Sequence, residues 1–250
     1  MEDKMIRVAI THGDTNGIGY EVILKTFATP TILELCTPIV YGSPKLVAYH
    51  RKALNLETSF NIIERAEDAC DGKLNILACF DDEVKVDLGQ PSEEAGKAAL
   101  MALDRAMTDY RSGLYDVLVT APINKATIQG EGFHFPGHTE YIETCVGEGN
   151  KALMILMNED LRVALVTTHL PIRNVAEAIT QEAIVEKASI FNLSLKRDFR
   201  ISSPRIAVLS LNPHAGDNGL LGNEEKDIII PAIEELEKKG IQAFGPFPAD

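Results

Sequence analysis

Four segments of this chain share one plan. Each has an unbroken run of Val, Ile, Leu and Ala of strand length, then a polar turn containing proline or glycine, then a helical pattern. The segments are MIRVAITHGD, DVLVTAPINK, RVALVTTHLP and RIAVLSLNPHAG. Unbroken apolar runs suit strands buried on both faces, as in a parallel or mixed sheet covered by helices. The chain is therefore predicted to belong to the α/β class.

Helix signals lie between these strands. Ser92 is expected to cap a helix that ends at Gly113. Thr180 is expected to cap a second helix, and a third is expected over 231–239, just before Gly240. No fixed-period repeat is present, so the chain is not a solenoid.

A pause in the strand-helix pattern suggests a domain boundary. It falls in the glycine-rich loop IQGEGFHFPGHTE, and we predict domains over 1–128 and 129–250. A chain of 250 residues, 45% of them hydrophobic, is long enough for one large or two modest cores.

Charge and composition limit the partners of the chain. The formal net charge of -13, with no local run of Lys or Arg, argues against nucleic acid and anionic membranes as partners. No stretch reaches the roughly 18 consecutive apolar residues that a membrane span needs, and charges near the start argue against a signal peptide. The 4 cysteines are irregularly spaced without a CxxC pair, so we expect reduced thiols and a cytoplasmic location.

Three of the apolar runs are followed by residues that can carry chemistry. These are Asn124 and Lys125 after the second run, His169 after the third, and Asn212 and His214 after the fourth. In open α/β sheets, side chains just beyond the carboxyl ends of strands converge on one edge, where ligands bind. Each histidine alone fits a structural role, but two at equivalent strand ends favour a metal site. A third ligand is still required, and spacing does not identify it.

The loop over 133–140 holds two histidines. His134 and His138 are four residues apart, but Pro136 and Gly137 argue against the helix that an HExxH metal site needs. Thr139 is expected to cap a helix over EYIETCV, which would place His138 at the positive helix end. An anionic ligand fits there, and so does a simple cap beside a surface histidine.

The first turn contains three glycines but does not match the dinucleotide fingerprint. From Gly17 the chain reads GIGYEV, so Val22 occupies the place of the third glycine in G-x-G-x-x-G. No acidic residue ends a clean second strand about twenty residues later. A strand-to-helix turn that needs glycine for backbone geometry and close packing is the favoured interpretation.

Six motifs, taken together and in order, carry a family resemblance. They are GDTNGIGYE, VTAPINK, FPGHTEYI, VTTHLPI, LNPHAGDNGLLG and GPFPAD. The set resembles the 4-hydroxythreonine-4-phosphate dehydrogenase family of vitamin B6 biosynthesis. The resemblance implies two α/β/α domains with a cleft between them, as in isocitrate and isopropylmalate dehydrogenases. It also implies a metal-dependent NAD(P) oxidoreductase, which oxidises 4-phosphooxy-L-threonine with decarboxylation to 3-amino-2-oxopropyl phosphate for pyridoxal phosphate biosynthesis.

The resemblance also implies roles for individual residues. His169 and His214 match metal ligands of the family, and His138 and Thr139 match substrate-binding positions. Asp250 matches an acidic residue near the metal and is a candidate catalytic or metal-supporting carboxylate. The resemblance assigns no cofactor-binding residue, and Asn124 and Lys125 lie in a family motif without an assigned role.

The chain departs from the family pattern in two places. The family commonly has proline where this chain has His12 and Tyr20, and Pro-Ala where it has Thr15 and Asn16. The sequence also stops at Asp250, before the third metal-binding histidine and further substrate positions of the family. The resemblance implies that a C-terminal portion completes the first domain and that the partner in a homodimer supplies the third histidine. We expect the 250-residue chain alone to bind metal weakly and to show little dehydrogenase activity.

The same residues are compatible with other functions, metals and cofactors. A related dehydrogenase for phosphorylated threonate or erythronate fits the same motifs, and so does a non-catalytic protein that binds a phosphorylated metabolite. The metal could be Zn, Co, Mn or Mg, because histidine and carboxylate ligands do not select one ion. NAD and NADP are equally compatible with the sequence.

Overall fold

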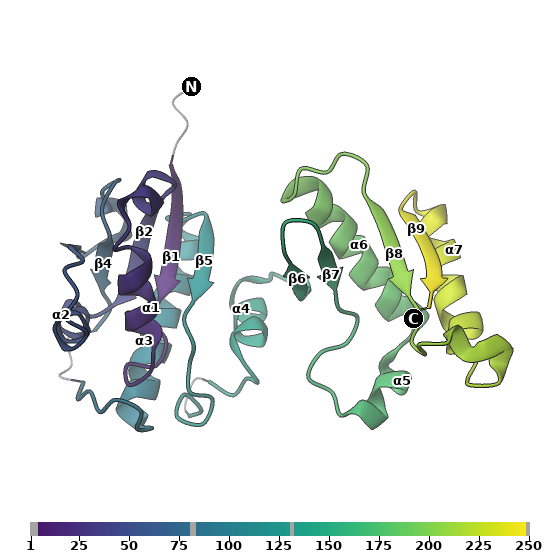
Figure 1. Cartoon of the computed structure of the whole chain (residues 1–250), viewed down its shortest axis with the longest axis horizontal. Helices are drawn as coiled ribbons and strands as arrows, with labels where there is room; N and C mark the ends of the chain where they lie inside the picture. The colour runs from purple at the N-terminus through teal and green to yellow at the C-terminus, as the bar shows by residue number, and fades with distance from the viewer. Residues whose placement is uncertain (1–4, 81–83, 131–132, 249–250) are drawn as a thin grey trace. The chain divides into compact units, whose positions relative to one another are not determined.

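The computed structural model describes residues 5–80, 84–130 and 133–248. Contacts divide the chain into two compact units, Met1–Ala152 and Leu153–Asp250, which are treated separately below (Figure 1). This division lies after the sequence-based boundary at 128, because Phe133 and Tyr141 are buried in the core of the first unit. No helix in the described part of the chain is long and apolar enough to cross a membrane.

The first unit is built on a parallel sheet, which confirms the predicted α/β class. Its order is β3-β4-β2-β1-β5, and every neighbouring pair is parallel. The strands are β1 (Ile6–Thr11), β2 (Cys36–Gly42), β3 (Asn61–Ile63), β4 (Asn75–Ala78) and β5 (Val117–Thr120).

Four α-helices and two short 3₁₀ segments connect these strands. Their bounds are α1 (Gly19–Thr26), η1 (Pro30–Glu34), α2 (Pro44–Ala53), η2 (Ala66–Asp68), α3 (Glu93–Arg111) and α4 (His138–Val146). The predicted cap of α3 is confirmed, since the Ser92 hydroxyl accepts a hydrogen bond from the Ala95 amide at 3.1 Å. Gly113 follows the helix with φ of +68°, as its place at the helix end predicts.

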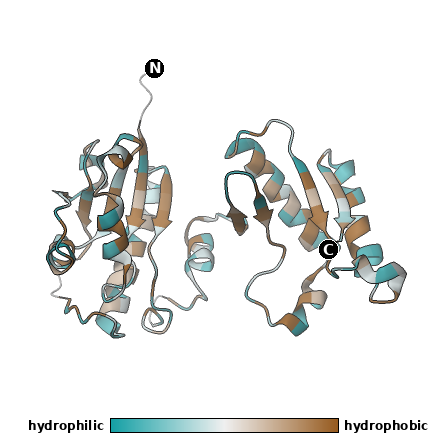
Figure 2. Cartoon of the chain, viewed as in Figure 1, coloured by the Kyte–Doolittle hydropathy of each residue, from teal (hydrophilic) through white to brown (hydrophobic). Residues whose placement is uncertain are grey.

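Alternate residues of the strands enter two separate cores. Ala9 and Ile39 pack with α3, whereas Ile10 and Val40 pack with α1 and α2. Much of the length of the strands in this unit is accordingly hydrophobic, with hydrophilic bands between the hydrophobic ones (Figure 2). Burial on both faces explains why the apolar runs in the sequence are unbroken.

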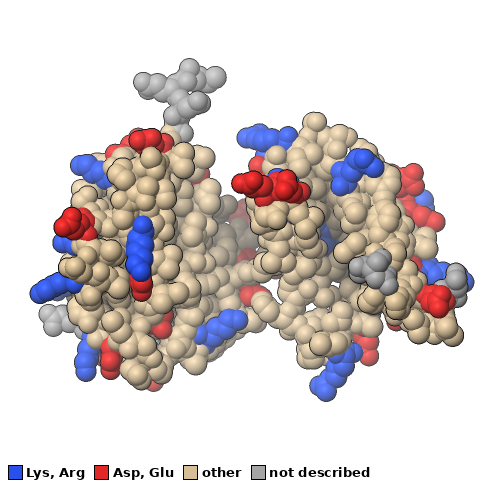
Figure 3. Space-filling view, viewed as in Figure 1, with Lys and Arg blue, Asp and Glu red and all other residues tan. Residues whose placement is uncertain are grey.

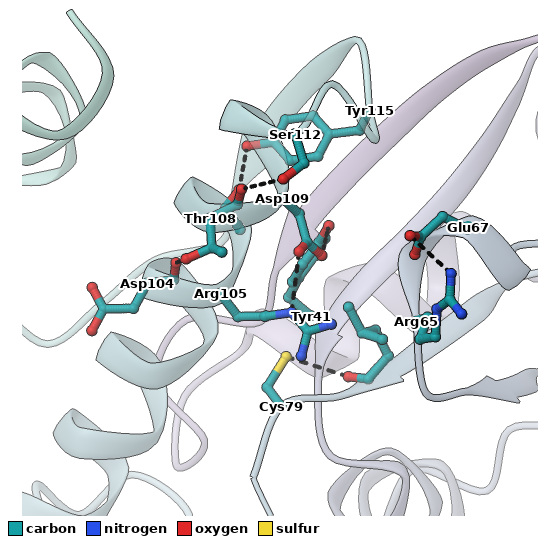
Figure 4. A network of polar contacts seen from close by, with 12 residues as sticks. Tyr41, Arg65, Glu67, Cys79, Asp104, Arg105, Thr108, Asp109, Ser112 and Tyr115 are labelled. Carbon is teal, nitrogen blue, oxygen red and sulfur yellow. Dashed lines mark hydrogen bonds and ion pairs between the residues drawn. The ribbon is translucent and has the colours of Figure 1, made fainter.

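A polar network fastens α3 to the sheet (Figure 4). The buried carboxylate of Asp109 accepts a hydrogen bond from the Tyr41 hydroxyl at 2.9 Å and pairs with the Arg105 guanidinium at 3.2 Å. Tyr115 donates to the Ala106 carbonyl at 2.9 Å. Burial, together with the nearby Asp109 charge, raises the pKa of Tyr41, so its hydroxyl remains a proton donor.

Removing one member of this network should destabilise the first unit. Tyr41→Phe leaves the buried Asp109 carboxylate without one donor, so we expect a loss of about 1 to 2 kcal/mol in unfolding free energy. Urea titration followed by circular dichroism measures it. Tyr49→Phe removes the hydroxyl of a tyrosine that is 46% exposed, and should have almost no effect. Equal losses in the two variants would contradict the stabilising role of the hydrogen bond.

The second unit contains two small sheets. An antiparallel pair joins β6 (Ile155–Met157) to β7 (Arg162–Ala164), and a parallel pair joins β8 (Arg205–Leu209) to β9 (Gln242–Phe247). The helical segments are η3 (Ile172–Asn174), α5 (Val175–Ala178), α6 (Gln181–Arg197), η4 (Ala215–Gly219), the π-helical η5 (Glu225–Ile229) and α7 (Ile230–Lys238).

The core of this unit forms where α6 and α7 pack with β8 and β9. Phe191 and Leu195 of α6, Leu236 of α7, Ile206 of β8 and Ala243 of β9 are all buried there. The predicted cap of α6 is confirmed, because the Thr180 hydroxyl accepts a hydrogen bond from the Ala183 amide. The third predicted helix is present as α7, one residue earlier at each end.

The expectation that three strands meet at one sheet edge is wrong for the described residues. Strand β5 belongs to the five-stranded sheet, β7 pairs only with β6, and β8 pairs only with β9. The apolar run of β7 forms just three strand residues, all half-buried. A tight turn in which the Asn158 amide donates to the Leu161 carbonyl at 2.9 Å favours the local hairpin.

Candidate active site

The turn between β1 and α1 is closed by backbone packing. A Cβ atom on Gly19 would lie 2.0 Å from the His12 carbonyl oxygen, and one on Gly13 would lie 2.3 Å from the Pro122 oxygen. The Asp14 amide also donates to Pro122 O at 2.9 Å. The glycines are thus required by contacts within the chain, which agrees with the packing interpretation rather than with a dinucleotide loop.

His12 lies in the interior of the first unit. Its ring is fully buried, stacks on Tyr20 with centroids 5.0 Å apart, and contacts Phe80 at 5.8 Å. Neither ring nitrogen makes a hydrogen bond of normal geometry with a described residue. Burial lowers the pKa of His12 to about 4, and weaker polar contacts with the backbone of Ala98 and Gly13 offset part of this effect. His12 is therefore a neutral core residue.

The sequence did not indicate a role for Asn16. In the structure, its hydrogen bonds hold the segment that leads into α3 against the turn after β1. Its side-chain amide donates to Gln90 O at 2.8 Å, and its carbonyl oxygen accepts from the Asp87 amide at 2.9 Å. The Asn16 backbone oxygen accepts from the Gly89 amide at 2.9 Å. These bonds fix the segment that leads into α3. The only sequence signal was the departure from Pro-Ala at positions 15 and 16.

Asn124 builds the turn that follows β5. Its side-chain oxygen accepts hydrogen bonds from the amides of Ala126 at 3.0 Å and Thr127 at 3.3 Å, which is an Asx turn. The turn sits tightly on α3, because a Cβ atom on Gly96 would lie 2.0 Å from Thr127 O. Asn124 is thus structural, and it holds the neighbouring Lys125 at the surface.

The start of α4 differs from the sequence prediction. The N-cap is Gly137, in extended conformation with φ of -177°, so His138 begins the helix and Thr139 lies within its first turn. Gly137 has no side chain with which to cap the helix, and Glu140 is the acidic residue of the first turn. The prediction that Thr139 caps the helix is therefore wrong. The extended residue from which the chain turns into α4 is Gly137, so the helix begins two residues earlier than predicted.

Aromatic packing seats α4 on the first unit. Phe133 is fully buried and contacts Phe135 and Tyr141, with ring centroids 5.6 and 5.3 Å away. His138 is half-buried at the helix start. Burial lowers the pKa of His138, and the nearby positive charge of Lys125 lowers it further. The charge of Lys125, in the turn after β5, therefore acts on His138.

The two predicted metal ligands lie in loops of the second unit. His169 follows β7 with φ of +55°, and His214 precedes η4; both are exposed. The His214 amide donates to the Asn212 side-chain oxygen at 2.9 Å, while the Asn212 amide donates to Glu225 at 2.8 Å. These bonds fix the loop that carries His214.

The donor set for a metal is incomplete in the described chain. Two imidazoles are suitable ligands for a divalent transition metal, but such a site needs at least one further donor. Among the residues that the structure describes, no three His, Cys, Asp or Glu side chains form a group able to hold an ion. Asp250, the candidate carboxylate, lies outside the described residues, since the description ends at 248.

A family model for "Pyridoxal phosphate biosynthetic protein PdxA" matches residues 34–250. The chain belongs to this family. A PdxA relative from Bacteroides thetaiotaomicron, named 4-hydroxythreonine-4-phosphate dehydrogenase, is 64% identical over 250 residues, covering 100% of this chain and 69% of the relative. One of the same name from Sulfurihydrogenibium sp. is 37% identical over 246 residues, covering 98% and 75%.

Solved structures of PdxA-type enzymes are similar to this chain in fold. A 4-hydroxythreonine-4-phosphate dehydrogenase from Burkholderia phymatum superposes with a TM-score of 0.84 at 34% identity, covering 99% of this chain and 76% of that one. The enzyme from Klebsiella pneumoniae gives 0.86 at 29% identity, covering 98% and 75%. The family resemblance seen in the six motifs is thus confirmed. The prediction of an α/β oxidoreductase that acts in pyridoxal phosphate biosynthesis is also confirmed at the level of the family.

Proposed function

We propose that this PdxA chain takes part in the NAD(P)-dependent oxidation of 4-phosphooxy-L-threonine, with decarboxylation to 3-amino-2-oxopropyl phosphate. One observation carries the proposal. His138 and Thr139 occupy the first turn of α4, in a chain that is 64% identical over its whole length to a relative named 4-hydroxythreonine-4-phosphate dehydrogenase.

The helix start suits an anionic substrate. The N-cap residue Gly137 has no side chain to bind the first amides of α4, and the partial positive charge of these amides suits an anionic group. The lowered pKa of His138 keeps its ring neutral near pH 7, so the ring can donate one hydrogen bond and accept another. The Thr139 hydroxyl adds a donor and acceptor one residue further. These groups would orient a phosphorylated hydroxy amino acid.

His169 and His214 would provide two ligands of the metal, with the others outside the described residues. A divalent ion held there would supply Lewis-acid chemistry for oxidation of the substrate hydroxyl and for the loss of CO₂. Imidazole ligands favour Zn or Co over Mg. We extend the proposal to Asp250 as a catalytic or metal-supporting carboxylate, and to a homodimer that completes the site.

Scattered surface charge supports a small-molecule substrate. On the face in view, basic and acidic side chains are interspersed and no basic patch gathers in its described part (Figure 3). All four cysteines are free, which is consistent with the proposed cytoplasmic location.

We also propose that the relatives' additional length contributes to the first unit. This chain spans 69% of the Bacteroides relative. Strand β5 ends the five-stranded sheet, and its Val117 and Val119 are 48% and 47% exposed. A further element of the family fold would cover these side chains and complete the first domain.

The direct test is NAD(P)H formation by the purified chain with divalent metal. With 4-phosphooxy-L-threonine we expect slow, metal-dependent reduction, and faster reduction when the chain is extended with the C-terminal part of the Bacteroides relative. Faster reduction with phosphorylated threonate or erythronate than with 4-phosphooxy-L-threonine would show that the proposed substrate is wrong. Thermal stabilisation by the substrate, without reduction even in the extended chain, would instead identify a non-catalytic binding protein.

His138→Ala should weaken binding of 4-phosphooxy-L-threonine. Loss of one hydrogen bond to a charged group predicts an increase in Kd of about tenfold or more. Isothermal titration calorimetry measures it. His134→Ala is the matched control, because His134 is exposed in the same loop and should leave Kd unchanged. Identical affinities in the two variants would remove His138 from the substrate site.

A further inference from the structure

Glu225 is a buried acid whose carboxyl group is only half used by the described residues. The residue is 5% exposed. Its Oε1 accepts a hydrogen bond from the Asn212 amide at 2.8 Å, whereas Oε2 is buried without a hydrogen-bond partner among the described residues. Asp109, another buried acid, is bound by both the Tyr41 hydroxyl and the Arg105 guanidinium. Incomplete hydrogen bonding makes burial of a carboxyl group unfavourable, so Glu225 calls for an explanation other than stability.

The carboxyl group of Glu225 lies against the loop that carries His214. Glu225 begins the π-helical turn η5, and such turns are rare and frequent at functional sites. A Cβ atom on Gly216 would lie 2.9 Å from Glu225 Oε2 and 2.8 Å from the Gly222 oxygen. The carboxyl group therefore contacts the loop at its start, through Asn212, and closely approaches its middle, at Gly216.

Asn212 connects Glu225 to the backbone on both sides of His214. The Asn212 side-chain oxygen accepts a hydrogen bond from the His214 amide at 2.9 Å, and its backbone oxygen accepts from the Ala215 amide at 2.8 Å. The Asn212 side-chain amide donates to Leu221 O at 3.3 Å. Glu225 thus acts on the His214 turn through one residue that is itself held at several points.

The backbone next to His214 has a conformation that needs such support. Ala215 and Asp217 have φ of +50° and +44°, in the left-handed region that residues other than glycine rarely adopt. Residues in this region persist only where the surrounding structure holds them, and they cluster at functional sites. Glu225 is therefore the buried anchor of a strained turn, and this turn carries a residue assigned above to the metal.

We propose that Glu225 is a positioning residue for His214. Through Asn212 it holds the His214 turn in the conformation from which the imidazole binds a divalent ion, so this part of the site exists before the ion binds. The inference rests on the proposed function, because it takes His214 as a metal ligand. Residues that orient a metal ligand are typically worth 10- to 100-fold in metal affinity.

Calorimetric titration of the purified chain with Zn²⁺ tests the assignment. Glu225→Met keeps the length of the side chain but removes the acceptor, and should raise Kd for Zn²⁺ about 10- to 100-fold. Glu225→Gln keeps an oxygen that can accept from the Asn212 amide and should retain most of the affinity. Glu234→Met, at an exposed position of α7, is the matched control and should bind like wild type. His214→Ala gives the level of Zn²⁺ binding that does not involve His214.

Hydrogen exchange in the metal-free chain separates positioning from a general loss of structure. In Glu225→Met, exchange should become faster at the amides of Asn212 and His214 and should keep its wild-type rate in α6. The visible absorption of bound Co²⁺, which reports coordination geometry, should change in Glu225→Met and be preserved in Glu225→Gln. Faster exchange throughout the second unit, with Zn²⁺ affinity unchanged, would show that Glu225 is only structural.

Asn212→Ala provides a second variant that does not alter the buried acid. It removes the side-chain oxygen that binds the His214 amide and leaves the backbone amide that donates to Glu225. Zn²⁺ binding should weaken by a factor similar to that of Glu225→Met, and the double variant should be little weaker than either single one, because both act through one chain of contacts. Wild-type affinity in Asn212→Ala would contradict the proposed connection.

The outcomes distinguish this inference from the proposed function. Equal Zn²⁺ affinity in wild type and Glu225→Met, with weaker binding in His214→Ala, would overturn the role of Glu225 and leave His214 as a metal ligand. Equal affinity in wild type and His214→Ala, also in the chain extended with the relative's C-terminal part, would remove His214 from the metal site and overturn both.

Discussion

Replacing Gly96 by alanine should destabilise the first unit by about 3 kcal/mol or more. The new Cβ atom would lie 2.0 Å from the Thr127 oxygen and 2.4 Å from its carbonyl carbon. Both are backbone atoms in a hydrogen-bonded turn, so neither can move aside as a side chain would. This clash exceeds the gain of up to about 1 kcal/mol that alanine brings to a helix. Urea unfolding followed by circular dichroism measures the difference.

Gly130→Ala provides the matched control. A Cβ atom there meets nothing within 4 Å, and its φ lies outside the left-handed region. We expect a change within about 0.5 kcal/mol, as at most surface positions. An unfolding free energy equal to that of wild type in Gly96→Ala would show that α3 can move away from the turn that contains Thr127 without loss of stability.

Acidification should destabilise the first unit through His12. Its pKa is about 4 in the folded chain, against 6.5 for a histidine exposed to water, so the unfolded chain binds a proton first as the pH falls. The stabilisation is fully present above pH 6.5 and is lost as the pH falls toward 4. From these two values, linkage predicts a loss of about 2 kcal/mol between about pH 7.5 and pH 5. Urea titrations at both pH values measure this loss.

A variant isolates this contribution from other groups. His50 lies near His12 and also has a lowered pKa, mainly through burial, so it acts in the same direction. His12→Phe should reduce the pH-dependent loss by about 2 kcal/mol, whatever it does to stability at neutral pH. His134→Phe, at an exposed position, should keep the wild-type dependence. An unchanged dependence in His12→Phe would show that protonation of His12 does not drive the loss.

Features that depend on a few neighbouring residues could be predicted from the sequence. Ser92 and Thr180 cap their helices because each hydroxyl reaches an amide three residues later. Gly240 ends α7 with φ of +76°, as a glycine after a helix predicts. The same reasoning gave a wrong prediction for Thr139, because the N-cap of α4 is Gly137.

Features that join distant segments could not be predicted in this way. The strand pattern indicated a parallel sheet, but strands of three residues in β6 and β7 carry too little periodicity to reveal their pairing. The hydrogen bonds of Asn16 reach residues more than 70 positions away. Helix α3 contacts the turn after β5 at Gly96 and contacts α4 through the hydrogen bond from Tyr141 to Asp104.

The position of β1 in the sheet affects how the first unit forms during synthesis. Although β1 is the first strand made, it lies between β2 and β5, and Val8 aligns with Val117. Its second partner, β5, is synthesised only after α3 is complete, so one edge of β1 stays unpaired while the segment between the two strands is made. Such long-range pairing is slow and exposes strand edges to aggregation. We therefore expect the pairing of β5 with β1 to be a late step in the folding of this unit.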